Sequence, residues 1–338
     1  FYYVSAWLVW IGSLLSALWI LIANSWMHTP AGYRVEGGKA ILTSFWAAAL
    51  NPSIGPRYVH TVVATLIAGC FVVAAVAGYY FLKRRDTAFA RQAMTYAVVV
   101  GVVLSVAMPF IGHWHALVVA EHQPIKMAAF ENVGDTQKNA PLYLFGWVRS
   151  DGETIGLAIP SGLSLMLGLS PGHEVTGLNS VAAGDRPPVQ IVFQSYHLMI
   201  ALGFFFALVF LVAVALRIRG RLEKARWMHW VLIGCLPLSL LAINMGWTTT
   251  EVGRQPWVVQ GLMRTSDGVS PTVSAGEIWA TLGIFALVYL VLFIAWLRIF
   301  LGIIKKGPDD VTRMPEAGHT TPGPVATDAV AAPAGTER

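Results

Sequence analysis

Three side chains that can ligate iron lie near the ends of three separate apolar segments of the sequence. His60 lies at the start of one segment, Met199 lies inside another, and Glu251 follows a third. An imidazole paired with a thioether suits a low-spin electron-transfer haem, because the soft sulfur favours reduced iron. The ordinary alternatives are a packing or hydrogen-bonding role for His60 and a gap-filling role for Met199.

His197 is a rival ligand in the same segment as Met199. The two residues are about 200° apart around a helix, so only one of them can face a shared iron. Spacing alone favours His197 as the second ligand beside His60.

The stretch from Gly246 to Trp257, GWTTTEVGRQPW, places a carboxylate and a guanidinium where an apolar segment ends. Charged groups at such a position indicate a binding site. The alternatives are an ion pair between Glu251 and Arg254, which have the i,i+3 spacing, and an interfacial role for Trp247 and Trp257.

A second pair of charged residues, Lys126 and Glu131, lies within QPIKMAAFE. On a helix they would be about 140° apart and would not pair with each other. A carboxylate there can accept protons from a bound substrate while an ammonium donates a hydrogen bond to its oxygen; a solvated loop is the alternative. Three nearby histidines lack the spacing of a zinc site: His113, His115 and His122.

The elements that must position these residues are membrane-spanning helices. The 338 residues are 56% hydrophobic and 12% charged, with a mean hydropathy of +0.60, which is typical of a polytopic membrane protein. Apolar runs of about 20 residues, enough to cross a bilayer, lie near 4–24, 58–82, 93–111, 191–216, 228–248 and 276–301. We therefore predict an all-α bundle of six spans, since an open sheet cannot satisfy its backbone in lipid.

Basic residues in the short connections predict the orientation of the bundle. By the positive-inside rule, the cytoplasmic connections are those that carry Lys83, Arg84, Arg85 and Arg91; Arg217, Arg219, Arg221, Lys224 and Arg226; and Lys305 with Lys306. Residues 1–306 then form the membrane domain, with a long outer loop at 112–190 that we expect to be functional. Residues 307–338 are expected to be a disordered cytoplasmic tail.

Cys70 and Cys235 lie in apolar runs without a Cys-x-x-Cys-His motif, so neither a disulfide framework nor a c-type haem is indicated. The chain begins at Phe1 and shows no signal peptide. We expect it to be a fragment that lacks its amino-terminal part.

Taken together, these motifs resemble subunit I of the cytochrome bd quinol oxidases. The resemblance covers most of the chain and is most specific in GRQPW, residues 253–257. Its other parts, in order, are SALWILIANSWM at 16–27, LNP at 50–52, VHT at 59–61, the stretch from Lys126 to Glu131, Met199, and GW at 246–247.

The resemblance implies a role for each matching residue. His60 and Met199 would ligate a low-spin haem b, and Glu251 would belong to a high-spin haem b centre. Lys126 and Glu131 match the quinol-binding loop, and Arg254 is placed to neutralise haem propionates, which suits a rigid bidentate cation. Trp247 would lie beside the cofactors.

The implied activity is that of a respiratory terminal oxidase in a bacterial cytoplasmic membrane. Quinol would give two electrons to the low-spin haem at the outer face and release its protons outward through Glu131. A high-spin pair, with haem d or a further haem b, would reduce O2 to water with protons from inside. Subunit II and small membrane subunits are the implied partners, and ubiquinol and menaquinol are equally compatible substrates.

The sequence departs from the family pattern at several points. Members have nine spans, so the six here correspond to the carboxyl-terminal two thirds, and we expect this fragment to be inactive alone. His197 stands where arginine is expected, and His113 where an acidic residue is common. These changes predict an altered setting for the low-spin haem.

Two other functions compete with the oxidase. A proton-coupled transporter using Glu251 and Arg254 would show internal repeats and broken helices near the bilayer midplane, and the sequence has no such repeat. A haem-binding electron-transfer or assembly subunit that never meets oxygen has the same motifs. Haem spectra separate the transporter from the other two, and oxygen uptake separates those two from each other.

Overall fold

Six long helices dominate the computed structural model, which describes residues 1–308. They are α1 (Tyr2–His28), α3 (Ile54–Lys83), α4 (Thr87–His122), α7 (Val189–Ile218), α8 (Arg226–Val252) and α9 (Ala275–Lys306). All six are long and apolar enough to cross a membrane, which confirms the predicted spans. Each helix exceeds its apolar run, because helical hydrogen bonding continues into the polar residues at both ends.

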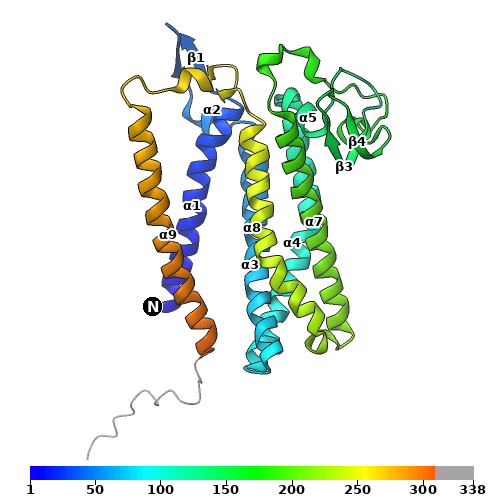
Figure 1. Cartoon of the computed structure of the whole chain (residues 1–338), viewed down its shortest axis with the longest axis vertical. Coiled ribbons are helices and arrows are strands. Elements are labelled where there is room, and N and C mark those ends of the chain that lie inside the picture. The colour runs from blue at the N-terminus through cyan, green and yellow to red at the C-terminus, as the bar shows by residue number, and fades with distance from the viewer. Residues whose placement is uncertain (309–338) are drawn as a thin grey trace, which may run out of the picture. The chain divides into compact units, whose positions relative to one another are not determined.

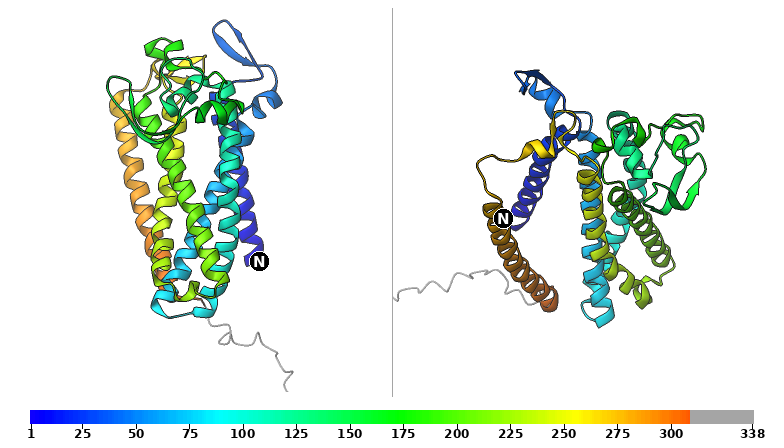
Figure 2. Two further views of the ribbon diagram at one scale, coloured as in Figure 1. Left: turned by 90° about the vertical axis from the view of Figure 1, so that its right-hand side faces the viewer. Right: turned by 45° about the horizontal axis from the view of Figure 1, so that its top comes forward.

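The chain divides into two compact units, Phe1–Val291 and Leu292–Arg338, with the boundary inside α9. Within the first unit, α3 packs against α4 and α8, and α7 packs against α4 and α8. These four helices run side by side in Figure 1 and in the turned views of Figure 2. Apart from 307 and 308, the predicted tail lies outside the described residues.

Aromatic rings fill the centre of the four-helix group. Phe71 of α3 is fully buried and stacks on Phe210 of α7, with ring centroids 4.5 Å apart. Gly101 of α4 gives this ring its space, since a Cβ there would lie 2.4 Å from the Phe210 ring. Close packing of this kind fixes the helices that carry His60, Met199 and Glu251.

The segment predicted as an outer loop is largely folded. Helix α4 continues to His122, and α5 (Pro124–Glu131) follows after one residue. Strands β3 (Leu142–Val148) and β4 (Thr154–Ile159) form an antiparallel hairpin, followed by α6 (Gly162–Gly168), η1 (Leu178–Ser180) and η2 (Ala183–Asp185). A buried apolar cluster that includes Met127, Leu163 and Tyr196 joins α5 and α6 to α7.

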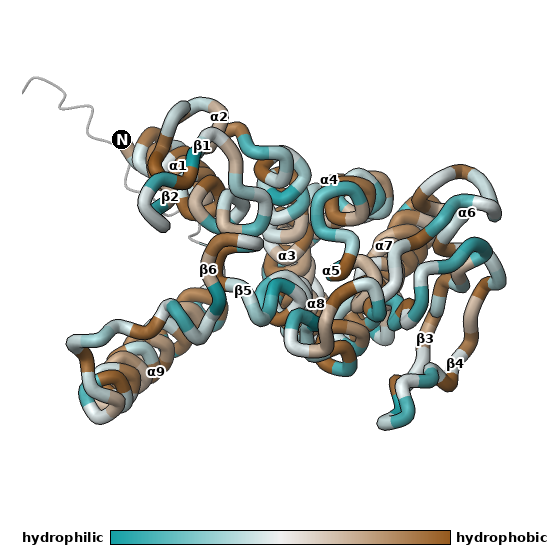
Figure 3. Tube along the Cα trace, turned by 90° about the horizontal axis from the view of Figure 1, so that it is seen from above, coloured by the Kyte–Doolittle hydropathy of each residue, from teal (hydrophilic) through white to brown (hydrophobic). Residues whose placement is uncertain are grey.

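The remaining short elements connect the helices. Strands β1 (Tyr33–Glu36) and β2 (Lys39–Leu42) and strands β5 (Trp257–Val259) and β6 (Met263–Arg264) form two further hairpins; α2 is Phe45–Ala49, η3 Leu222–Lys224 and η4 Thr265–Gly268. Seen from above, β1, β2 and the surroundings of α5 and α8 mix hydrophilic with hydrophobic residues (Figure 3). This is the end of the helices that the sequence predicts to face outward.

Candidate functional site

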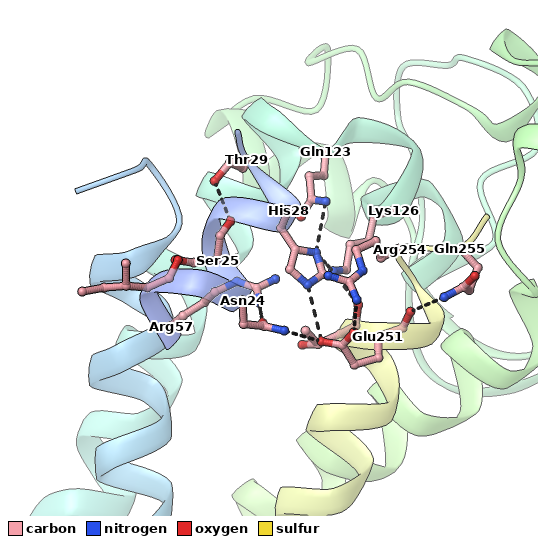
Figure 4. Close-up of polar contacts among 12 residues, drawn as sticks. Asn24, Ser25, His28, Thr29, Arg57, Gln123, Lys126, Glu251, Arg254 and Gln255 are labelled. Atoms are coloured by element: carbon pink, nitrogen blue, oxygen red, sulfur yellow. Dashed lines mark hydrogen bonds and ion pairs between the residues drawn. The ribbon is translucent and has the colours of Figure 1, made fainter. Parts of the chain in front are cut away.

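A buried group of polar side chains lies where α1, α3 and α8 meet α5, at the helix ends that the sequence predicts to face outward (Figure 4). Glu251 is at its centre. Asn24 Nδ2 donates to Glu251 Oε1 at 2.8 Å, Arg254 pairs with Oε2, and His28 Nε2 lies 3.6 Å from Oε1. We call this group the polar cluster; its members are Asn24, His28, Arg57, Gln123, Lys126, Glu251 and Arg254.

His28 connects Glu251 with α5. It is fully buried, and its Nδ1 lies 3.3 Å from Lys126 Nζ and 3.4 Å from Gln123 Nε2. Both of these neighbours are hydrogen-bond donors, so Nδ1 must be the acceptor, and in the neutral ring Nε2 carries the hydrogen. That N–H faces the Glu251 carboxylate.

Lys126 is buried where α5 meets α1 and α8, so the solvated-loop alternative is wrong. Its exposed fraction is 4%, and its Nζ donates to the backbone oxygen of Thr250 at 2.9 Å. Loss of hydration by burial, together with the nearby Arg57 guanidinium, holds the pKa of Lys126 well below its usual range.

The polar cluster holds more positive than negative charge. Arg57, Lys126 and Arg254 are buried, whereas Glu251 is its one carboxylate. Arg57 Nη1 donates to Asn24 Oδ1 at 2.8 Å, but Arg57 Nε and Arg254 Nε and Nη1 have no partner in the described part of the chain. Unpaired buried donors with excess positive charge suit an anionic group.

His60 and Met199 each lie beside a glycine of a neighbouring helix. A Cβ on Gly112 of α4 would lie 3.9 Å from His60 Cε1, and one on Gly246 of α8 would lie 2.8 Å from Met199 Sδ. His60 Nδ1 is buried without a partner, and the ring of His115 lies edge-on to it, with centroids 5.7 Å apart. An orphaned imidazole nitrogen, and glycines that let both side chains approach the neighbouring helices, fit a flat cofactor such as haem.

His197 makes other contacts. Its Nδ1 lies 2.8 Å from the Phe193 oxygen and its Nε2 3.0 Å from the Tyr143 oxygen, with Glu131 Oε2 at 3.7 Å. Both ring nitrogens are therefore occupied. In this arrangement His197 is not free to ligate a metal, so Met199 is the better candidate on α7.

Glu131 is buried under the β3–β4 hairpin, 1% exposed. The backbone N–H of Tyr143 donates to its Oε2 at 2.9 Å, while Oε1 has no partner in the part of the chain that the structure describes. Burial raises the pKa of Glu131, although the His197 and Tyr143 contacts oppose that shift. As predicted, Glu131 and Lys126 face different partners from one helix.

Trp247 and His113 are exposed and are not members of the polar cluster. Trp247 is 49% exposed, as an interfacial aromatic would be, and its role beside a cofactor stays a prediction. His113 is exposed as well. The ion pair between Glu251 and Arg254, which the sequence offered as an alternative to a binding site, is present and belongs to the polar cluster.

The family model described as cytochrome bd terminal oxidase subunit I matches residues 1–308 of this sequence. The chain belongs to this family. The cytochrome bd ubiquinol oxidase subunit 1 of Bacillus subtilis (strain 168) is 32% identical over 315 residues, which are 90% of this chain and 67% of that protein. The solved bd oxidase of Geobacillus thermodenitrificans has a TM-score of 0.81 and 32% identity, covering 88% of this chain and 68% of that one.

Two further bd-family relatives extend the comparison. The putative cytochrome bd menaquinol oxidase subunit I of Bacillus subtilis (strain 168) is 32% identical over 316 residues, 91% of this chain and 70% of that protein. The cytochrome bd-II ubiquinol oxidase subunit 1 of Escherichia coli (strain K12) is 27% identical over 372 residues, 89% of this chain and 72% of that protein. The predicted family and its helical membrane fold are thus confirmed.

Sequence reasoning gave no site role to five residues of this cytochrome bd subunit I site: Asn24, His28, Arg57, His115 and Gln123. Arg57 precedes His60 by one helical turn, and a charged residue at a span end is a signal that was available. His28 directly follows the SALWILIANSWM motif. His115 and Gln123 carried no signal of their own, because their partners lie on other helices.

Proposed function

We propose that this chain is the quinol-oxidising, haem-binding subunit of a terminal oxidase that reduces O2 to water in a bacterial cytoplasmic membrane. Family membership supports this function over a transporter. The relatives are named for ubiquinol and for menaquinol, so the proposal covers a quinol of either kind. Subunit II and small membrane subunits would complete the enzyme.

One observation supports the proposal: two buried guanidinium groups and a buried lysine share the polar cluster with a single carboxylate. Excess buried positive charge is costly unless an anion compensates it. The propionates of haem would supply that anion, with Arg254 and Arg57 offering their unpaired N–H groups. A guanidinium suits a carboxylate because its donors form a planar fork.

The proposed roles of the cofactor residues are those that the family resemblance implies. His60 and Met199 would ligate a low-spin haem b, and Glu251 a high-spin haem b, with a haem d or a further haem b at the oxygen site. When bound, the haems supply one-electron transfer between quinol and oxygen. Asn24 and Arg254 hold the Glu251 carboxylate from two sides, which fixes its orientation.

Lys126 and Glu131 would handle the quinol. A carboxylate with a raised pKa is a better proton acceptor near neutral pH than an ordinary one, and Glu131 Oε1 is unpartnered. When protonated, the Lys126 side chain carries three hydrogens, and those that face His28 and Thr250 account for two. The third remains for a quinol oxygen.

The test uses the purified complex made from the full-length gene. A dithionite-reduced minus oxidised spectrum should show b-type haem, and the complex should consume oxygen with quinol. His60→Ala and Met199→Leu should each diminish the low-spin band. Met228→Leu, a buried methionine at the opposite end of α8, should not.

The absence of haem from the wild-type complex would refute the proposal. Haem without quinol-dependent oxygen uptake would leave an electron-transfer or assembly subunit.

A further inference from the structure

His28 joins two parts of the proposed site that lie on different elements. It is the last residue of α1, while Lys126 belongs to α5 and Glu251 to α8. Lys126 Nζ lies 3.3 Å from one ring nitrogen, and Glu251 Oε1 lies 3.6 Å from the other. The imidazole therefore stands between the residue proposed for quinol and the residue proposed for the high-spin haem (Figure 4).

The neighbours of the His28 ring determine which of its nitrogens accepts a hydrogen bond and which donates one. Lys126 and Gln123 present N–H donors to Nδ1, which must accept. Nε2 then carries its hydrogen toward Glu251, and no other partner lies within hydrogen-bond distance of it in the described chain. Since a buried N–H is costly to leave unpaired, a shift of a few tenths of an ångström toward the carboxylate satisfies it.

We propose that His28 is a positioning residue that holds the Glu251 carboxylate through its Nε2–H and the Lys126 ammonium through its Nδ1. This inference rests on the proposed function and extends it, because it couples the quinol side of the site to the haem side by one rigid ring. Groups that hydrogen-bond a metal-ligating residue orient it and tune the metal. Asn24 binds the same carboxylate oxygen, also from α1, so this helix end sets the orientation of Glu251.

Two substitutions of His28 separate hydrogen bonding from packing. His28→Gln keeps an acceptor and a donor on the side chain. His28→Leu fills much of the volume and offers neither. His229→Leu is the matched control, because His229 is also almost fully buried but lies at the opposite end of α8, bonded to the Glu223 oxygen.

The readout is the EPR line shape of the high-spin iron in the complete complex, with the low-spin optical band as internal reference. We expect His28→Leu to change the high-spin line shape and to lower kcat about tenfold or more, the scale for partners of metal ligands, with KM for quinol changed less. The low-spin band should remain. His28→Gln should keep the wild-type line shape, and so should His229→Leu.

Lys126→Met provides an independent arm if His28→Leu fails to assemble. It removes the nearer of the two donors to Nδ1, leaves Gln123 in place, and does not alter α1. The proposal expects it to alter the high-spin line shape as well as quinol oxidation, whereas a purely structural His28 leaves the line shape unchanged.

An unaltered high-spin signal in His28→Leu, or in Lys126→Met when the former does not assemble, overturns the role of His28 while the oxidase proposal stands. A wild-type complex without haem overturns the oxidase proposal instead.

Discussion

Replacing Gly246 by alanine tests whether Met199 ligates a haem in the space beside α8. The new Cβ would lie 2.8 Å from Met199 Sδ, whereas nonbonded heavy atoms rest comfortably at about 3.5–4.0 Å. The sulfur must therefore move by roughly 0.7–1.2 Å. Metal–ligand distances are held within about 0.2 Å, so a shift of this size breaks the bond.

The assay is a redox titration of the low-spin band in the intact complex. Loss of the thioether removes the ligand that favours reduced iron, so Gly246→Ala should lower the midpoint potential and diminish the low-spin signal. Gly234→Ala is the matched control on the same helix, because nothing lies within 4 Å of a Cβ there. That control should be neutral or stabilising by up to about 1 kcal/mol, the helix propensity difference.

If Gly246→Ala and Gly234→Ala give the same potential and the same low-spin signal, Met199 does not hold iron at this position. The ligand assignment on α7 would then have to be abandoned, although family membership would be unaffected.

The remaining predictions concern other parts of the site and fold. Quinol oxidation should rise with pH as Glu131 deprotonates, with a midpoint above the usual carboxyl range because its pKa is raised; Glu131→Gln should abolish this rise in a pH–rate profile. Arg254→Leu removes the guanidinium that pairs with Glu251 Oε2 and should cost about 3 kcal/mol in thermal unfolding, the low end for buried pairs, since that carboxylate is 24% exposed; Arg254→Lys should recover part of it. Gly101→Ala presses on the Phe210 ring and should destabilise by about 1–3 kcal/mol, and a melting temperature equal to wild type would contradict that packing.

The spans were predictable because one physical requirement, about 20 apolar residues to cross a bilayer, leaves a continuous local signal. Glu251 and Arg254 were predictable as a pair for the same reason, since their spacing is local. The contact of Asn24 with Glu251 joins residues 227 positions apart, and that of His28 with Lys126 joins residues 98 apart. Contacts of that range depend on how helices pack, which the spacing of residues along one helix does not encode.

The sequence also did not predict that the outer segment, residues 112–190, is folded. Its composition indicated a loop, but the buried apolar cluster under β3 and β4 forms only when α5 and α6 pack against α7. Lys126 is buried by its contacts with α1 and α8, and Glu131 by its contacts with β3 and α7. Burial is the main cause of both pKa shifts.

The hydrogen bond from Tyr143 N–H to Glu131 ties the proposed proton acceptor to the edge of the β3–β4 hairpin. The hairpin carries exposed apolar side chains at Phe145, Trp147 and Ile155. A compound or antibody that binds these side chains would shift strand β3 and, with it, the Glu131 carboxylate. Inhibition of this kind would act through the backbone of the strand and not by direct contact with the carboxylate.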